Sequence, residues 1–253
     1  MSRSNPTDNS PNPCKRWFEW DGGNGLVRYY DKEKKENIEV GSDLVFIVLD
    51  ELCTIKGWHD ASDSGIFANE IRDTRAETFV VKSFKEGELA SGFYKDIRDR
   101  VGNMGGNFVA NLYIAFKENG EMHLGSLQIK GAALNAWVEF KKKNRADILK
   151  KAVQIKGSTE GKKGKIVFHT PNFFIKNITD ETDAQAIALD KELQVYLEGY
   201  FKRTVTKQAV PAHQAAEDEN QEPNYPSEPP PGIDPESGEP VGEDGTVNGD
   251  IPF

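Results

Sequence analysis

Residues 107–117 of the chain read NFVANLYIAFK, and this alternation of apolar and polar side chains predicts a β-strand with one core-facing side. The even positions, from Phe108 to Phe116, are all apolar. The odd positions carry two asparagines, Tyr113 and Lys117 among smaller side chains. Because successive side chains of a strand point to opposite faces, the odd positions should form a mostly polar face that bears one tyrosine.

Shorter apolar or alternating runs on both sides of this stretch predict further strands. They are Leu26–Tyr30, Asp43–Trp58, Phe67–Arg72, Thr78–Phe84, His123–Ile129, Lys151–Gly157 and Lys165–Thr170. Apolar residues at helical spacing predict helices over Glu88–Val101 and Ala132–Asn144. A last helix is expected to begin near Thr182, where Thr182 and Gln185 fit a capping box. Short strands, glycine turns and inserted helices indicate a mainly β chain with added helices (β+α). They favour an elaborated OB-fold-like antiparallel barrel, with a sandwich as the alternative.

The composition divides the chain into three parts. Residues 1–13 are rich in Ser, Asn and Pro and predict a flexible leader, and residues 14–207 carry the periodic apolar signal of a folded core. Residues 208–253 contain nine of the 13 prolines and 11 acidic residues but no Lys or Arg. Such a segment cannot bury enough apolar surface to offset its ordering entropy, so we expect a disordered acidic tail.

The charge is distributed as unevenly as the prolines. All 32 Lys and Arg lie in residues 1–207 with 30 of the 41 acids, so the core is close to +2 while the tail is −11. The leader has no apolar segment of a signal peptide, and no apolar run is long enough to span a membrane. The two cysteines, Cys14 and Cys53, lack metal-ligand spacing and suit a reducing, cytoplasmic setting.

The chain ends in an apolar tip that follows this polar tail: Asp250, Ile251, Pro252 and Phe253. A terminal phenylalanine can fill a small pocket of a partner while its α-carboxylate pairs with an arginine or lysine. We therefore interpret these four residues as a partner-docking motif.

In these four residues the chain resembles bacterial single-stranded DNA-binding proteins. An acidic tail that ends in Phe also resembles the single-stranded DNA-binding proteins of tailed phages. The resemblance implies an OB-fold core that binds single-stranded DNA in replication, recombination and repair, and a tip that recruits partner enzymes. It also implies the cytoplasm of a bacterium or an infected bacterial host. The bacterial tip usually has consecutive acids before the isoleucine, whereas Asn248 and Gly249 precede a single Asp250 here.

Aromatic and basic residues share several predicted strand faces, as a protein that stacks unpaired bases and holds phosphates requires. Lys56 lies beside Trp58, Lys82 beside Phe84, and Tyr113 near Lys117. We interpret the first five of these as candidate DNA contacts. The other candidate cations are Arg72, Arg75, Lys85, Lys156, Lys162, Lys163 and Lys165.

Signs of catalysis are weak. The glycine-rich segments 22–25 and 102–106 do not lead into Gly-Lys-Ser/Thr, and His59 with Asp60 and Asp63 is more typical of a polar loop than of a metal site. We therefore expect a non-enzymatic protein without cofactor or metal. Its expected partners are single-stranded DNA and replication, repair or recombination proteins, and a homo-oligomer remains open. The alternatives are a single-strand annealing or recombination mediator, a metal-dependent nuclease and an accessory replication factor.

Overall fold

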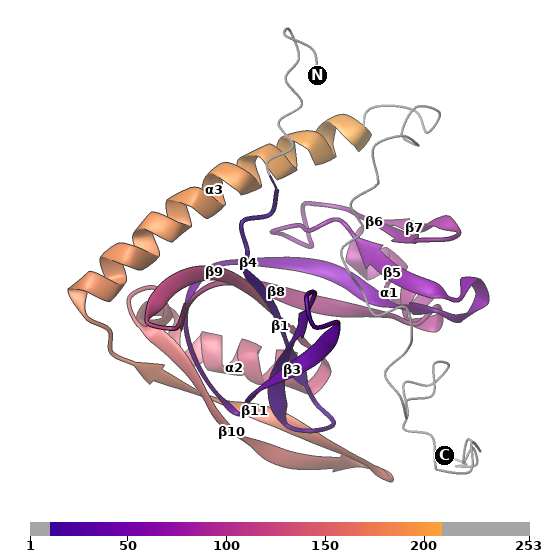
Figure 1. Ribbon diagram of the computed structural model, residues 1–253. Helices are drawn as coiled ribbons and strands as arrows, with labels where there is room; N and C mark the ends of the chain where they lie inside the picture. Colours follow the sequence, from indigo (N-terminus) through magenta and orange to yellow (C-terminus); the bar gives the residue numbers. More distant parts are fainter. Residues whose placement is uncertain (1–10, 209–253) are drawn as a thin grey trace, which may run out of the picture.

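The computed structural model describes the backbone of residues 11–208 and the side chains of residues 11–203. Most of the predicted leader, and the predicted tail with its tip, lie outside the described residues. Within the described part the chain is mainly β with three α-helices, as predicted (Figure 1). No helix in residues 11–208 is both long enough and apolar enough to cross a membrane.

The strands include every predicted one, although several bounds differ, and three that were not predicted, two at the N-terminal end and one at residues 87–92. They are β1 (Arg16–Asp21), β2 (Leu26–Asp31), β3 (Glu36–Gly41), β4 (Asp43–His59), β5 (Ser64–Ala68), β6 (Phe79–Ser83), β7 (Gly87–Gly92), β8 (Gly106–Glu118), β9 (Glu121–Lys130), β10 (Ala152–Lys163) and β11 (Ile166–Lys176). The helices are α1 (Tyr94–Asn103), α2 (Gly131–Ile148) and α3 (Asp180–Gln208).

The strands form one mixed sheet in the order β3-β2-β1-β9-β8-β4-β5-β6-β7, and β10 joins β4 while β11 joins β10. All described neighbours are antiparallel except β1 and β9, which run parallel. The sheet does not close on itself, because β3 and β7 are separate ends of the order. The prediction of an OB-fold-like antiparallel barrel is therefore wrong. Alternation within a strand does not encode which strands become neighbours.

Strand β4 organises the sheet. One of its edges pairs with β8 from Phe46↔Phe116 to Gly57↔Gly106, with a register shift between Val48 and Asp50. Its other edge is shared, because its first residues pair with β10 and its last residues pair with β5. One long strand thus joins the β10–β11 hairpin to the β5–β6–β7 end of the sheet.

Apolar side chains from alternate positions fill two clusters on the inner face of the sheet. The larger cluster contains Phe46, Leu112 and Ile114 and is covered by α2, whose Trp137 is fully buried. The smaller cluster contains Ile55, Ile66 and Phe79 and is covered by α1. The even positions of β8 face this core, as the alternation predicts.

The outer face carries α3, which the sequence did not place there. Leu193 and Leu197 of α3 are fully buried against Leu52, Tyr113 and Leu124 of the sheet. Nearer the start of the helix, Ala186 packs with Ile47 and Ala115. The odd face of β8 was expected to be mostly polar, but it is covered by α3 and buried from Val109 to Ala115.

Three predicted boundaries are wrong for local reasons. The predicted helix Glu88–Val101 is split, because Leu89 and Ala90 belong to β7 and Gly92 breaks the chain direction at φ 143° before α1 begins. The predicted strand 67–72 ends at Ala68, and Ile71 keeps only an isolated bridge to Cys53. Helix α3 begins two residues earlier than expected, and the hydroxyl of Thr179 accepts a hydrogen bond from the Thr182 N–H (3.2 Å).

A buried carboxyl lies between α3 and the sheet. The Tyr113 hydroxyl donates to Glu70 Oε2 (2.7 Å), Asn111 Nδ2 donates to Glu70 Oε1 (2.5 Å), and the Ser126 hydroxyl donates to the Asn111 amide oxygen. The backbone N–H of Glu70 donates to the hydroxyl of Tyr200 on α3 (2.7 Å). Burial raises the pKa of the Glu70 carboxyl above its ordinary value of 4.5, although the hydrogen bond from Tyr113 opposes this rise.

Glu70→Gln should change how stability depends on pH. Folded Glu70 keeps its proton to a higher pH than unfolded Glu70, so this group's contribution is complete below about pH 4.5 and is lost as the pH rises toward the folded pKa. Urea unfolding at several pH values above about 4.5 should therefore show wild-type stability falling relative to that of the variant.

The matched control is Glu139→Gln on the exposed side of α2. The hydrogen bond from Lys142 lowers the pKa of Glu139. The stability of the wild type relative to that of Glu139→Gln should therefore not fall as the pH rises. A constant difference between wild type and Glu70→Gln across the pH range would contradict the raised pKa.

Candidate nucleic-acid interface

Two cross-strand rows lie beside each other on the outer face of β4, β5 and β6. In the first row, Lys56 pairs with Phe67 and Phe67 pairs with Lys82. In the second row, Trp58 pairs with Gly65, whose carbonyl accepts a hydrogen bond from the N–H of Phe84 (3.3 Å). We call these six residues the β4–β6 patch.

The opposite face of the same strands explains why these side chains point outward. Ile55, Ile66, Phe79 and Val81 are fully or almost fully buried in the inner cluster that α1 covers. Because the period of a strand is two, burying these positions turns their neighbours to the outer face. Lys56, Trp58, Phe67 and Lys82 are partly exposed, and Phe84 is 38% exposed.

A glycine determines how Phe84 lies in the patch. A Cβ atom on Gly65 would meet the ring of Phe84 at 3.1 Å, so the missing side chain lets this ring lie across the neighbouring strand. The ring stacks on Phe67 with centroids 4.6 Å apart and an interplanar angle of 27°. The two rings therefore form a nearly parallel aromatic pair, with a lysine on each side of Phe67 in the same row.

The basic residues predicted near this patch have different surroundings. Lys85 follows Phe84, and its ammonium donates to the Asp63 carbonyl (2.6 Å) and lies 3.5 Å from the Asp63 carboxylate. Arg72 pairs with Asp50 (2.8 Å) and lies over the ring of Phe201 on α3 (5.2 Å to the centroid). Arg72 thus connects α3 to the sheet. Arg75 is exposed in the 69–78 segment, where its backbone N–H donates to Asp73.

The interpretation of Tyr113 as a stacking residue is wrong. Its ring is 1% exposed beneath α3, and its hydroxyl is hydrogen-bonded to Glu70. Strand alternation placed it correctly on the outer face, but it could not show that a helix some 70 residues later in the chain covers that part of the face. No base can reach this ring in the described structure.

The other predicted cations lie far from the β4–β6 patch. Lys156, Lys162, Lys163 and Lys165 all belong to the β10–β11 hairpin, where each is exposed. This hairpin pairs with the first residues of β4, whereas the patch uses the last residues of β4. The predicted DNA-contacting residues therefore form two groups rather than one.

Phe67 is the residue of the patch that sequence reasoning missed. It appeared as the first residue of a predicted strand but not as a candidate contact, because the one basic residue of that strand, Arg72, has the opposite parity. Only the pairing of Phe67 with Lys56 and Lys82 brings it between two cations.

A polar cluster adjoins the patch without forming a catalytic relay. The Nδ1 atom of His59 lies 2.8 Å from the Ser62 hydroxyl and 3.1 Å from the Glu86 carboxylate. A serine nucleophile and an orienting carboxylate must contact different ring nitrogens, so one shared nitrogen does not build a triad. Among the described residues, no three or more His, Cys, Asp and Glu side chains are grouped as a metal site would need.

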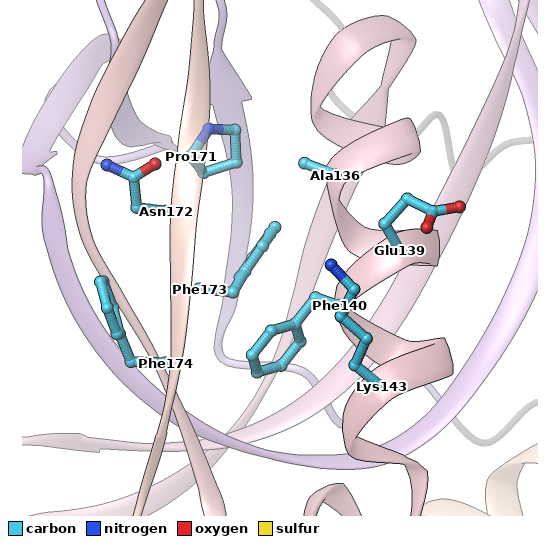
Figure 2. Close-up of a pocket in the computed structure, with 8 residues that line it drawn as sticks. All are labelled: Ala136, Glu139, Phe140, Lys143, Pro171, Asn172, Phe173 and Phe174. Carbon is cyan, nitrogen blue, oxygen red and sulfur yellow. The ribbon is translucent and has the colours of Figure 1, made fainter.

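The pocket drawn in Figure 2 lies elsewhere, between α2 and β11. Its wall includes Phe140, Lys143 and Phe173, and the rings of Phe140 and Phe173 are 5.5 Å apart. It is mostly apolar, and the one carboxylate on its rim, Glu139, is paired with Lys142 (2.7 Å). The pocket therefore offers apolar packing surface but no reactive group.

No family model matches the chain, and neither a curated protein nor a solved structure matches it.

The contact between Gly65 and Phe84 can be tested by a double-mutant cycle. Gly65→Val in the wild type should force the Phe84 ring off Phe67 and lose a ring pair worth about 1 kcal/mol. In a Phe84→Ala background the same change should instead stabilise the strand, because valine favours β structure over glycine. Urea unfolding of the four proteins gives the coupling energy, and a coupling near zero would contradict the stacked arrangement.

Proposed function

We propose that the protein binds single-stranded DNA without strong sequence preference and protects it during replication or recombination, in the cytoplasm of a bacterium or an infected bacterial cell. The observation that supports this most directly is the β4–β6 patch, where Lys56 and Lys82 flank a partly exposed aromatic pair on the outer face of the sheet. Aromatic rings that accept bases and cations that accept phosphates are the two parts such a surface needs.

The geometry of the patch favours an unpaired strand over a duplex. Neighbouring strands lie about 4.8 Å apart, so the Cα atoms of Lys56 and Lys82 are roughly 10 Å apart across Phe67. A phosphate backbone could pass along this row while its bases turn onto Phe67, Phe84 or Trp58. Bases within a duplex are already stacked on each other and cannot present their faces in this way.

The uneven charge of the chain supports a regulatory role for residues 208–253. The segment carries 11 acids and no cation, so it is a tethered polyanion that can compete with phosphate for the patch. Its last four residues, Asp250 to Phe253, combine an apolar ring with a terminal carboxylate, which suits a small basic and apolar pocket on a partner enzyme. We propose that this tip recruits replication, repair or recombination proteins.

Removing a ring of the patch should weaken binding to single strands. Trp58→Ala and Phe84→Ala should each lower affinity for an oligo-dT strand by ~1–3 kcal/mol, because each removes one stacking surface.

Affinity for duplex DNA should be weaker than for single strands in the wild type. Binding to single strands should weaken with salt, with a logarithmic slope of about −0.7 for each phosphate contact.

Two matched variants separate stacking from general loss of surface. Phe84→Leu keeps an apolar side chain but removes the flat ring, so it should resemble Phe84→Ala. Trp17→Ala removes another exposed tryptophan that lies near a lysine but outside the patch, and it should leave binding unchanged. Equal affinity for single and double strands, or an effect of Trp17→Ala as large as that of Trp58→Ala, would rule out the proposed site.

Two truncations should separate the charge of residues 208–253 from the role of the tip. Deleting residues 208–253 removes 11 negative charges, so affinity for DNA should rise, most clearly at low salt where the field is least screened. Deleting only Phe253 leaves all 11 acidic side chains in place, so affinity for DNA should barely change while partner binding is lost.

The measurement is a DNA titration of both truncations beside a quantitative comparison of the host proteins that each retains. If the Phe253 deletion keeps every host protein that the full chain retains, the tip is not a docking motif. If deleting residues 208–253 leaves DNA affinity unchanged at low salt, the acidic segment does not compete for the patch.

A further inference from the structure

We propose that the β10–β11 hairpin is a second surface for single-stranded nucleic acid, which holds a segment separate from the one on the β4–β6 patch. This inference rests on the proposed function and extends it to a part of the fold that carries no residue of the patch. The surface is the outer face of the hairpin, with Phe168 and Phe174 as stacking rings.

The two faces of β11 differ in what they contact. Phe173 and Ile175 pack on the inner cluster, and Phe173 lies against Trp137 (5.4 Å between ring centroids). Figure 2 shows Phe173 directed toward α2 and Phe174 directed away from it. Phe174 is 51% exposed, and Phe168 shares its face of the strand because the two residues are an even number apart.

Phe168 lies on a glycine, as Phe84 does in the first patch. Phe168 pairs with Gly161 across the hairpin, and a Cβ atom on Gly161 would meet its ring at 2.5 Å. The missing side chain therefore allows the ring to lie against the neighbouring strand with its other side outward. The Phe84 ring on Gly65 and the Phe168 ring on Gly161 thus share one arrangement.

The charge of the hairpin suits a polyanion. Residues 152–176 contain five lysines and a single acid, Glu160. Register places Lys163 on the face of Phe168 and places Glu160 on the opposite face, where it pairs with His169. At the base of the hairpin Lys176 shares the face of Phe174, and the nearby Asp43 accepts a hydrogen bond from Gln154 (2.7 Å).

The position of the hairpin makes it a separate surface. Gln154 pairs with Val45 near the start of β4, and Phe67 pairs with Lys56 near its end, a separation of roughly 35 Å along the strand. Helix α3 packs on the outer face between these points, against Ile47 and Leu52. Its first turn alone holds three acids, so it would repel a phosphate backbone laid across it.

The test is a titration of the full chain with short dT oligonucleotides of about six nucleotides, too short to reach both surfaces, and with dT strands of about 40 nucleotides. The full chain should bind two short oligonucleotides. Phe168→Ala/Phe174→Ala and Trp58→Ala should each bind one, and each should bind the long strand roughly 5- to 150-fold more weakly per lost stacking base.

Controls on the same strand keep the result interpretable. Val167→Ala removes an exposed side chain on the opposite face of β11 and should bind two oligonucleotides. Phe168→Tyr/Phe174→Tyr keeps both rings and should also bind two. Thermal unfolding should show that each variant used remains folded.

The outcomes distinguish this inference from the proposed function. If Trp58→Ala weakens binding but Phe168→Ala/Phe174→Ala changes neither stoichiometry nor affinity, the hairpin is not a binding surface while the first patch stands. If only the hairpin variant weakens binding, the hairpin stands and the β4–β6 patch is wrong. If the full chain does not prefer single strands over duplex, both proposals fall.

Discussion

The pairing of β4 with β8 is the constraint on which the rest of the structure depends. The two strands pair from Phe46 to Gly57, and both faces of β8 are buried between α2 on the inner side and α3 on the outer side. A one-residue slip of this ladder would turn every side chain of β4 to the wrong face and expose both clusters at once. The register shift between Val48 and Asp50 is part of this constraint, because it lets Phe46 and Ile55 face the same side despite their unequal parity. Both candidate binding surfaces adjoin the edge of β4 that does not pair with β8, one at each end.

Helix α3 is held on the outer face by polar as well as apolar contacts. Leu193 and Leu197 supply the buried apolar surface, while Glu70, Asn111 and Tyr113 form a hydrogen-bonded group beneath the helix. A buried carboxyl stabilises a fold less than an apolar side chain of similar size, but it requires its partners on β8 in one arrangement. The same residue bonds to the helix through its backbone N–H, which donates to Tyr200. The position of α3 also limits where the β4–β6 patch can lie. The outer face of β8 is buried from Ala115 back to Val109, and the partly exposed positions of the patch lie beyond it, at the end of β4 and on β5 and β6.

The sequence predicts the strands of this protein better than their neighbours. Alternation identified β4 and β8, because each is long and one face is consistently apolar. It missed β1, where Trp17 and Phe18 are adjacent aromatics without alternation, and it merged β7 with α1, because Leu89 and Ile97 also fit a helical spacing. The candidate site divides in the same way. Lys56 with Trp58, and Lys82 with Phe84, were predicted from parity within one strand, and the structure brings the two pairs together. Phe67 was missed and Tyr113 was misjudged, because their roles depend on register and on a helix distant in sequence.

Net charge is a poor guide to what such a surface binds. The chain is −9 as a whole, yet screening at physiological salt limits the field of an exposed charge to about 8 Å. A phosphate near Lys82 or Lys163 therefore responds to that lysine and its immediate neighbours rather than to the total. What matters is where the acids lie. Three occupy the first turn of α3 and Glu160 lies on the face of the hairpin opposite Phe168, whereas Glu88 pairs with Lys82 and Asp43 pairs with Lys156. The same short range means that residues 208–253 can act on a surface only when they lie against it. In the proposed function their 11 charges therefore act as a reversible competitor, whose effect depends on salt, rather than as a permanent reduction of the positive potential.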